Sequence, residues 1–169
     1  MKKNIVLTGF MGTGKTVTGK LLAEKLRMDF YDSDELIEKR EKKTINAIFA
    51  EKGESFFRSI ESAVLRDLSL KQNAAVSLGG GAVLNKENIN IFRKTSLIIN
   101  LTAQPETIYQ RIKDNSDRPL LNKKNPLQEI QKLLNFRKDF YADADFVFDT
   151  DGLTPQSAVD LIIKTVIKS

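Results

Sequence analysis

The sequence predicts an α/β fold in which a parallel sheet is packed between helices. Five short segments rich in β-branched and apolar residues alternate with segments whose apolar residues recur at helical spacing. The segment at 74–78 is an uninterrupted apolar run, as expected of a strand buried on both faces. The expected strands cover residues 4–8, 29–31, 74–78, 96–101 and 145–149.

Seven helices are expected between and beside these strands, with an eighth at the end of the chain. Val17, Leu21, Leu22 and Leu26 form the expected apolar stripe of the first helix. The seven helices cover about residues 17–26, 34–43, 45–53, 54–71, 86–94, 105–114 and 126–141. Thr154 at the N-cap and Pro155 at the first helical position predict the eighth.

Length and composition limit the classes of protein to consider. A chain of 169 residues can form one domain with a single core, so we expect one domain over residues 1–169. No apolar run approaches the roughly 18 residues of a membrane helix, and the apolar start is too short for a secretion signal. We therefore expect a cytoplasmic protein with no membrane partner. The net charge of +5 is dispersed, which argues against a nucleic-acid partner.

Cysteine and histidine are both absent. This absence excludes disulfides, thiol nucleophiles and metal sites built on cysteine or histidine. Any general base must then be a carboxylate, a lysine or a tyrosine.

Residues 9–16 read GFMGTGKT and match the phosphate-binding loop pattern GxxxxGK followed by serine or threonine. A short apolar strand precedes the loop and a helical pattern follows it, which is the context that the motif requires. Glycines let backbone N–H groups curl around phosphate oxygens at the N-terminus of a helix. Lys15 is then expected to reach the β- and γ-phosphates, and the Thr16 hydroxyl to bind Mg²⁺. The loop predicts a nucleotide ligand.

Two carboxylates, Asp32 and Asp34, follow the second expected strand. In extended backbone they would share one face, with Ser33 on the other, at the sheet edge where ligands bind in such folds. The alternative is that both acids only stabilise the start of a helix, which Asp34 is expected to open. The third strand carries Ser77 where many phosphate-loop enzymes have an acid near the metal, so Asp32 is the expected substitute.

Three further features are candidates for binding an acceptor. Arg58 and Glu61 lie three apart on one helix face, which by itself describes an exposed pair worth about 0.3 kcal/mol. Residues 79–81 are three glycines at a strand end, read either as a place of close ligand approach or as a flexible turn. Arg137 points inward from an apolar helix face and therefore needs an anion, either a structural carboxylate or a ligand.

Residues 114–125 form a polar segment between two helices. Arg118 lies in it before Pro119 and two leucines, so we expect a mobile lid that brings an arginine to the transferred phosphoryl group.

Together, the motifs GFMGTGKT, DSD, FFRSIE, GGG, RPLL and the helix of Arg137, in this order and spacing, resemble the shikimate kinase family over nearly the whole chain. The resemblance implies transfer of the ATP γ-phosphate to the 3-hydroxyl of shikimate in aromatic amino acid biosynthesis. It also implies a three-layer phosphate-loop kinase fold with strand order 2-3-1-4-5. We expect a monomer.

The resemblance also implies roles for individual residues, with Mg²⁺ as cofactor. The implied ATP-binding residues are Gly12, Thr13, Gly14, Lys15, Thr16, Val17, Arg111, Arg118, Leu153 and Pro155, of which Arg111 and Pro155 would sandwich the adenine. The implied shikimate-binding residues are Asp34, Arg58, Glu61, Gly79, Gly80, Gly81 and Arg137. Lys15, Asp34 and Arg118 would be catalytic, and Thr16 and Asp32 would hold the metal.

The chain departs from the family pattern on both sides of the helix arginine. Phe136 stands where the family usually has glutamate, and Asp139 where it often has proline. Gluconate kinases and nucleoside-monophosphate kinases share the fold and the loop, and differ in the acceptor that they hold. A non-catalytic nucleotide-binding protein is the alternative from another class, but it would be expected to have lost Lys15, Asp34 or the lid arginine.

Overall fold

The computed structural model describes residues 4–114 and 124–167. Five parallel strands form one sheet in the order β2-β3-β1-β4-β5, which confirms the expected topology. Their bounds are Asn4–Gly9 (β1), Asp29–Asp32 (β2), Ala74–Ser77 (β3), Ser96–Thr102 (β4) and Phe146–Asp149 (β5). Each strand begins and ends within one residue of its expected bounds.

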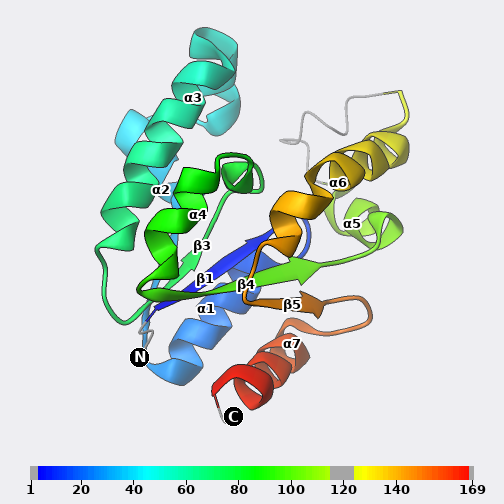
Figure 1. Cartoon of the computed structure of the whole chain (residues 1–169). Coiled ribbons are helices and arrows are strands. Elements are labelled where there is room, and N and C mark those ends of the chain that lie inside the picture. Colours follow the sequence, from blue (N-terminus) through cyan, green and yellow to red (C-terminus); the bar gives the residue numbers. More distant parts are fainter. Residues whose placement is uncertain (1–3, 115–123, 168–169) are drawn as a thin grey trace.

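Helices cover both faces of this sheet (Figure 1). The helices are Lys15–Leu26 (α1), Ser33–Glu41 (α2), Ile45–Ser69 (α3), Lys86–Arg93 (α4), Pro105–Ile112 (α5), Pro126–Ala142 (α6) and Pro155–Ile162 (α7), with a 3₁₀ turn at Ala82–Leu84 (η1) and a π-turn at Ile163–Ile167. The α1 and α7 helices pack on one face and α3, α4 and α6 on the other. None of the helices in the described ranges is long and apolar enough to cross a membrane.

Strand β1 shows how the sequence builds these two layers. Ile5 and Leu7 pack with α1 and α7, whereas Val6 between them packs with α3 and α4. This alternation follows from the period of two along a strand. Both cores therefore depend on β1, and its end carries the phosphate-binding loop.

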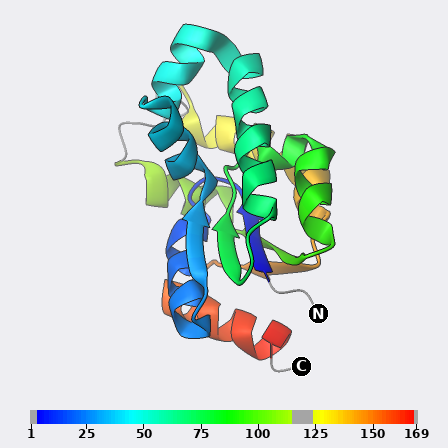
Figure 2. The ribbon, with the colours of Figure 1, turned by 90° about the vertical axis from the view of Figure 1, so that its left-hand side faces the viewer.

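Gly53 breaks α3 into the two helices that the sequence predicts. Its φ of +80° and ψ of 174° are not helical, a conformation that glycine adopts at little cost. Thr44 caps the first part by accepting a hydrogen bond from the N–H of Ala47. The chain turns over at this point and the longer second part runs back towards the sheet (Figure 2). That second part carries Arg58 and Glu61.

Two sequence predictions about helices are wrong. Asp32, not Asp34, caps α2, because its Oδ1 accepts the N–H groups of Asp34 and Glu35 at 3.0 and 3.4 Å. Val17 does not belong to the buried stripe of α1, since it is 51% exposed. It follows the loop directly and lines the cavity beside it.

Candidate active site

The phosphate-binding loop joins β1 to α1 at the carboxyl edge of the sheet. Gly12 and Gly14 have φ values of +78° and +91°, and a Cβ on Gly12 would lie only 2.8 Å from the Ile112 side chain. Lys15 is buried, and its ammonium group donates a hydrogen bond to the Phe10 carbonyl at 2.8 Å across the loop. No side chain caps the N-terminus of α1 in the described chain, so its first N–H groups suit an anion.

Thr16 and Asp32 meet beside this loop. The Thr16 hydroxyl donates a hydrogen bond to Asp32 Oδ2 at 2.7 Å, while Oδ1 of the same carboxylate caps α2. Asp32 pairs in register with Ser77 on β3. Asp32 therefore lies on the strand next to Ser77, in the place expected of a residue that substitutes for the missing acid.

Asp34 lies in the first turn of α2, not in extended backbone. It lines a cavity of about 170 Å³ together with the phosphate-binding loop, Asp32 and the glycines that follow β3. A Cβ on Gly79 would lie 2.5 Å from Asp34 Oδ1, so only glycine leaves room for this carboxylate. The prediction that Asp32 and Asp34 share one face of extended backbone was therefore wrong. Both residues nevertheless line the same cavity.

Ser33 was not predicted as a functional residue. It is fully buried, and its Oγ accepts a hydrogen bond from the N–H of Gly79 at 2.9 Å. This bond ties the start of α2 to the glycine turn and so fixes Asp34 against Gly79.

Arg58 and Glu61 form an ion pair that is not exposed. Arg58 Nη1 lies 2.7 Å from Glu61 Oε2, and the Glu61 side chain is 1% exposed. A Cβ on Gly81 would overlap the Arg58 guanidinium, which therefore lies directly against the glycine turn. The second carboxylate oxygen of Glu61 is buried without a hydrogen-bond partner among the described residues.

Burial raises the pKa of Glu61 above its ordinary value, and the positive charge of Arg58 only partly opposes the shift. A carboxyl whose pKa is higher in the folded than in the unfolded protein binds protons more tightly when folded. The folded state therefore loses stability as the pH rises from the unfolded value of 4.5 through the raised folded pKa.

Glu61→Gln should remove this pH dependence, because glutamine does not titrate. We expect the stability of the wild type relative to Glu61→Gln to decrease between pH 4 and pH 8, measured by urea unfolding at each pH. Glu54→Gln is the matched control, since Glu54 also contacts Arg58 but its side chain is 65% exposed. A stability difference that rises with pH would contradict the raised pKa.

Arg137 extends from α6 towards the glycine turn. Its Nη1 donates a hydrogen bond to the Gly80 carbonyl at 3.3 Å, and its guanidinium lies 5.7 Å from the centre of the Phe10 ring. Within the described residues no carboxylate lies at ion-pair distance from Arg137, and its Nε is buried without a partner. Of the two interpretations of an inward arginine, this geometry favours a ligand.

The glycine turn at residues 79–81 thus gathers the predicted acceptor residues. Gly79 lies against Asp34 and Glu61, Gly80 accepts from Arg137, and Gly81 lies against Arg58. The turn also lies beside the phosphate-binding loop, since a Cβ on Gly80 would be 3.5 Å from the Gly9 carbonyl. An acid and two arginines therefore converge next to the loop.

Arg111 holds the other side of the phosphate-binding loop. Its Nη1 donates to the Gly12 carbonyl at 3.2 Å and to Thr150 Oγ1 at 3.0 Å, and its Nη2 donates to the Thr150 carbonyl at 2.9 Å. Leu153 and Pro155 follow in the same turn, and Pro155 begins α7. Arg111 therefore contacts the loop directly, and the contact of Arg111, Leu153 and Pro155 with adenine stays a prediction.

Thr150 is a second residue that the sequence did not single out. Its buried hydroxyl lies 3.2 Å from the Thr13 carbonyl and 2.9 Å from the Thr102 carbonyl, and accepts from Arg111. It therefore joins the phosphate-binding loop to β4 and to the turn before α7.

Thr150→Val should weaken ATP binding, because valine has a similar shape but lacks the hydroxyl that accepts from Arg111 and links the Thr13 carbonyl of the loop to the Thr102 carbonyl. We expect the KM for ATP to rise about threefold to tenfold, from the roughly 1 kcal/mol that such a bond contributes. The KM for the acceptor should stay unchanged in steady-state assays. Thr102→Val is the control, since the Thr102 hydroxyl makes only a 3.4 Å hydrogen bond. Equal effects of the two variants would contradict this role.

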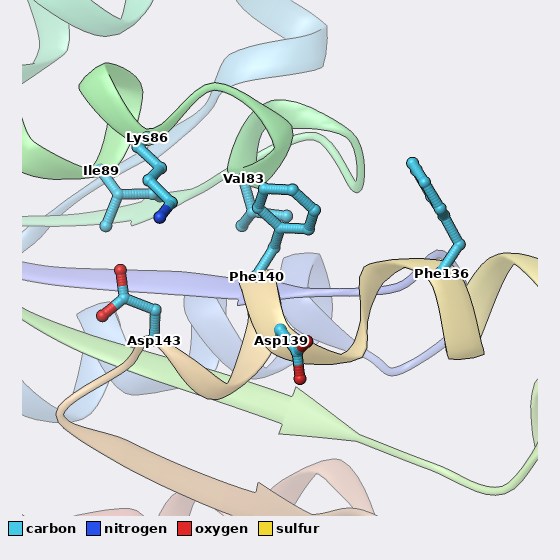
Figure 3. A pocket seen from close by; sticks show the side chains of 7 residues that line it. All are labelled: Val83, Lys86, Ile89, Phe136, Asp139, Phe140 and Asp143. Atoms are coloured by element: carbon cyan, nitrogen blue, oxygen red, sulfur yellow. The ribbon is translucent and has the colours of Figure 1, made fainter.

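A larger cavity of about 240 Å³ lies between α6 on one side and η1 and α4 on the other (Figure 3). Its lining on one side is Phe136, Asp139 and Phe140 of α6 and Asp143, which follows that helix, and on the other side Val83, Lys86 and Ile89. Phe136 and Asp139, where the chain departs from the family pattern, are among these residues. None of the predicted site residues lines this cavity, so we assign the chemistry to the smaller one.

The expected lid falls mostly outside the described residues. Of residues 114–125, only Asp114, Lys124 and Asn125 are described, and Arg118 is not among them. Asn125 caps α6, accepting a hydrogen bond from the N–H of Gln128 at 3.3 Å. The lid and its arginine therefore stay predictions.

A comparison with protein families agrees with this geometry. The model of the family described as shikimate kinase matches residues 11–167. The chain belongs to the shikimate kinase family. A shikimate kinase of Caldicellulosiruptor saccharolyticus is 48% identical over 161 residues, which cover 95% of this chain and 94% of the relative. One of Thermodesulfovibrio yellowstonii is 46% identical over 162 residues, 96% of this chain and 94% of the relative.

A solved structure of the shikimate kinase family has the same fold. It is the shikimate kinase from Acinetobacter baumannii in complex with shikimate, with a TM-score of 0.94 and 33% identity. The match covers 98% of this chain and 93% of that one. The likeness extends over the whole sheet and the helices on both faces.

Proposed function

We propose that this chain transfers the γ-phosphate of ATP to the 3-hydroxyl of shikimate, giving shikimate 3-phosphate and ADP. The observation that carries the proposal is the convergence of Asp34, Arg58 and Arg137 on one glycine turn beside the phosphate-binding loop. A small hydroxylated carboxylate suits this set, because two guanidinium groups can bind its carboxylate while an acid faces a hydroxyl. Membership of the shikimate kinase family supports the same acceptor.

On the acceptor side, Arg58 and Arg137 bind the carboxylate of shikimate. Glu61 orients Arg58 through the 2.7 Å ion pair. Asp34 accepts hydrogen bonds from the acceptor hydroxyls and takes the proton of the attacking one. The backbone of residues 79–81 lines the site, where glycine allows the ring of the substrate to approach closely.

On the phosphate side, backbone N–H groups of Gly12, Thr13 and Gly14 and the N-terminus of α1 bind the phosphates. Lys15 exchanges its hydrogen bond with the Phe10 carbonyl for one with the transferred phosphoryl group, whose negative charge its ammonium group stabilises.

The residues present fit Mg²⁺. A hydroxyl and a carboxylate already in contact, Thr16 and Asp32, supply the hard oxygen donors that this ion prefers. When bound, the ion neutralises charge on the phosphates.

The remaining assignments concern the adenine, the lid and the whole protein. Val17, Arg111, Leu153 and Pro155 would surround the nucleoside, and residues 114–125 would close over the site and bring Arg118 to the phosphoryl group. We propose that residues 1–169 act as one domain and as a monomer. We also propose a cytoplasmic location, because the reaction consumes ATP.

A coupled ADP-release assay tests the proposed function. The purified protein is mixed with ATP, Mg²⁺ and, separately, shikimate, gluconate and a panel of nucleoside monophosphates. We expect ADP release with shikimate and none above background with the others. Release with a nucleoside monophosphate or gluconate, and none with shikimate, would overturn the assignment.

A further inference from the structure

Tyr141 is a buried tyrosine on α6, one helical turn after Arg137. Its hydroxyl donates a hydrogen bond to the Gly80 carbonyl at 2.6 Å, which is short even for a bond between oxygen atoms. Burial raises the pKa of Tyr141 above its ordinary value, and the nearby charge of Arg137 opposes the shift. The phenol therefore stays protonated and available as a donor at neutral pH.

The Gly80 carbonyl has a second donor, Arg137. The Arg137 bond is 3.3 Å long, against 2.6 Å for Tyr141, so the tyrosine makes the stronger contact with the shared oxygen. The Arg137 guanidinium lies over the Phe10 ring, and its Nε is buried without a partner in the described chain. Arg137 thus keeps a donor for an anion.

We propose that Tyr141 is a positioning residue that keeps Arg137 available to the carboxylate of the acceptor by satisfying the Gly80 carbonyl in its place. This inference rests on the proposed function, in which Arg137 binds that carboxylate. Without the tyrosine hydroxyl, the carbonyl would need another donor, and Arg137 is the group already within reach. The guanidinium would then be drawn to the backbone, and its hydrogen bond to the ligand would weaken.

The same bond also fixes the glycine turn. Three successive glycines have a large freedom of backbone conformation, so their geometry depends on contacts with neighbouring side chains. Ser33 accepts the N–H of Gly79 on one side, and Tyr141 donates to the carbonyl of Gly80 on the other. Because a peptide group is planar, fixing the Gly80 carbonyl also sets the direction of the Gly81 N–H, next to Arg58.

Tyr141→Phe tests the proposal, because it removes the hydroxyl and keeps the ring. We expect the KM for shikimate to rise about fivefold, as for the loss of one hydrogen bond, with kcat and the KM for ATP changed less than about twofold. Tyr109→Phe is the matched control: Tyr109 is half-buried on α5, and the structure shows no hydrogen bond from its hydroxyl to a described residue. An equal rise of both KM values, or the same effect in the control, would overturn the proposal.

A double-mutant cycle separates positioning from a purely structural effect. In an Arg137→Ala background, Tyr141→Phe should lower kcat/KM for shikimate less than about twofold, since the residue through which Tyr141 mainly acts is gone and the Ser33 hydrogen bond still holds the glycine turn. A further fivefold loss there would overturn the proposal. The wild-type rate with shikimate tests the proposed function. The role of Tyr141 is tested separately by the ratio of the variant rate to the wild-type rate, measured with the acceptor of the panel that the wild type uses.

Discussion

Asp34→Asn should lower kcat for shikimate phosphorylation at least about 100-fold, the effect expected when a general base is lost. Asparagine has the same shape and still fits against Gly79, which lies at contact distance from the Asp34 carboxylate. It can accept a hydrogen bond through its carbonyl oxygen, but it cannot take the proton of the acceptor hydroxyl at neutral pH. Steady-state kinetics measure the change, and the KM for ATP should stay near its wild-type value.

Asp29→Asn is the control for this substitution, because Asp29 is an exposed residue at the start of β2, outside the cavity. It should leave kcat unchanged. A fall of less than about tenfold in Asp34→Asn would contradict proton transfer to Asp34 and would show that the carboxylate only aligns the hydroxyl. That outcome has a physical basis, because phosphoryl transfer through a loose transition state needs little help from a base.

The sequence predicted the sheet well because its strands are strongly apolar and its phosphate-binding loop has an unmistakable pattern. Alternation of strands and helices leads to a parallel sheet, and β1, β3 and β4 are buried as runs of apolar residues predict. Helix ends were also predicted correctly here, since Gly53 interrupts α3 and Thr44 caps its first part, as the sequence predicts. The strand order followed only from the resemblance, since no local pattern specifies which strands are neighbours.

The site was predicted only in part, and the reason is the long separation of its contacts in sequence. Ser33 and Gly79 are 46 residues apart, and Thr150 and Thr13 are 137 apart. A serine or threonine that accepts or donates one such bond carries no local signal. The exposure of the Arg58 and Glu61 pair was likewise misjudged, because helical spacing says that two residues are adjacent but not whether a glycine turn covers them.

Arg137→Ala should raise the KM for shikimate about 100-fold, because truncating an arginine that pairs with the acceptor carboxylate away from bulk water costs about 2.7 kcal/mol. The Arg137 guanidinium has no carboxylate at ion-pair distance among the described residues, so its loss should not leave an unpaired acid behind. The KM for ATP and the thermal midpoint should therefore change little. Kinetics with each substrate varied in turn measure the two KM values.

Two variants of the same helix decide how Arg137 acts. Lys138→Ala removes a positive charge from the next, exposed residue and should leave both KM values unchanged, which excludes a long-range effect of net charge. Arg137→Lys keeps the charge but loses the planar fork that binds a carboxylate through two parallel bonds, so its KM for shikimate should lie between those of wild type and Arg137→Ala. If Arg137→Ala raised both KM values equally and lowered the thermal midpoint, Arg137 would be a structural residue, and the acceptor carboxylate would depend on Arg58 alone.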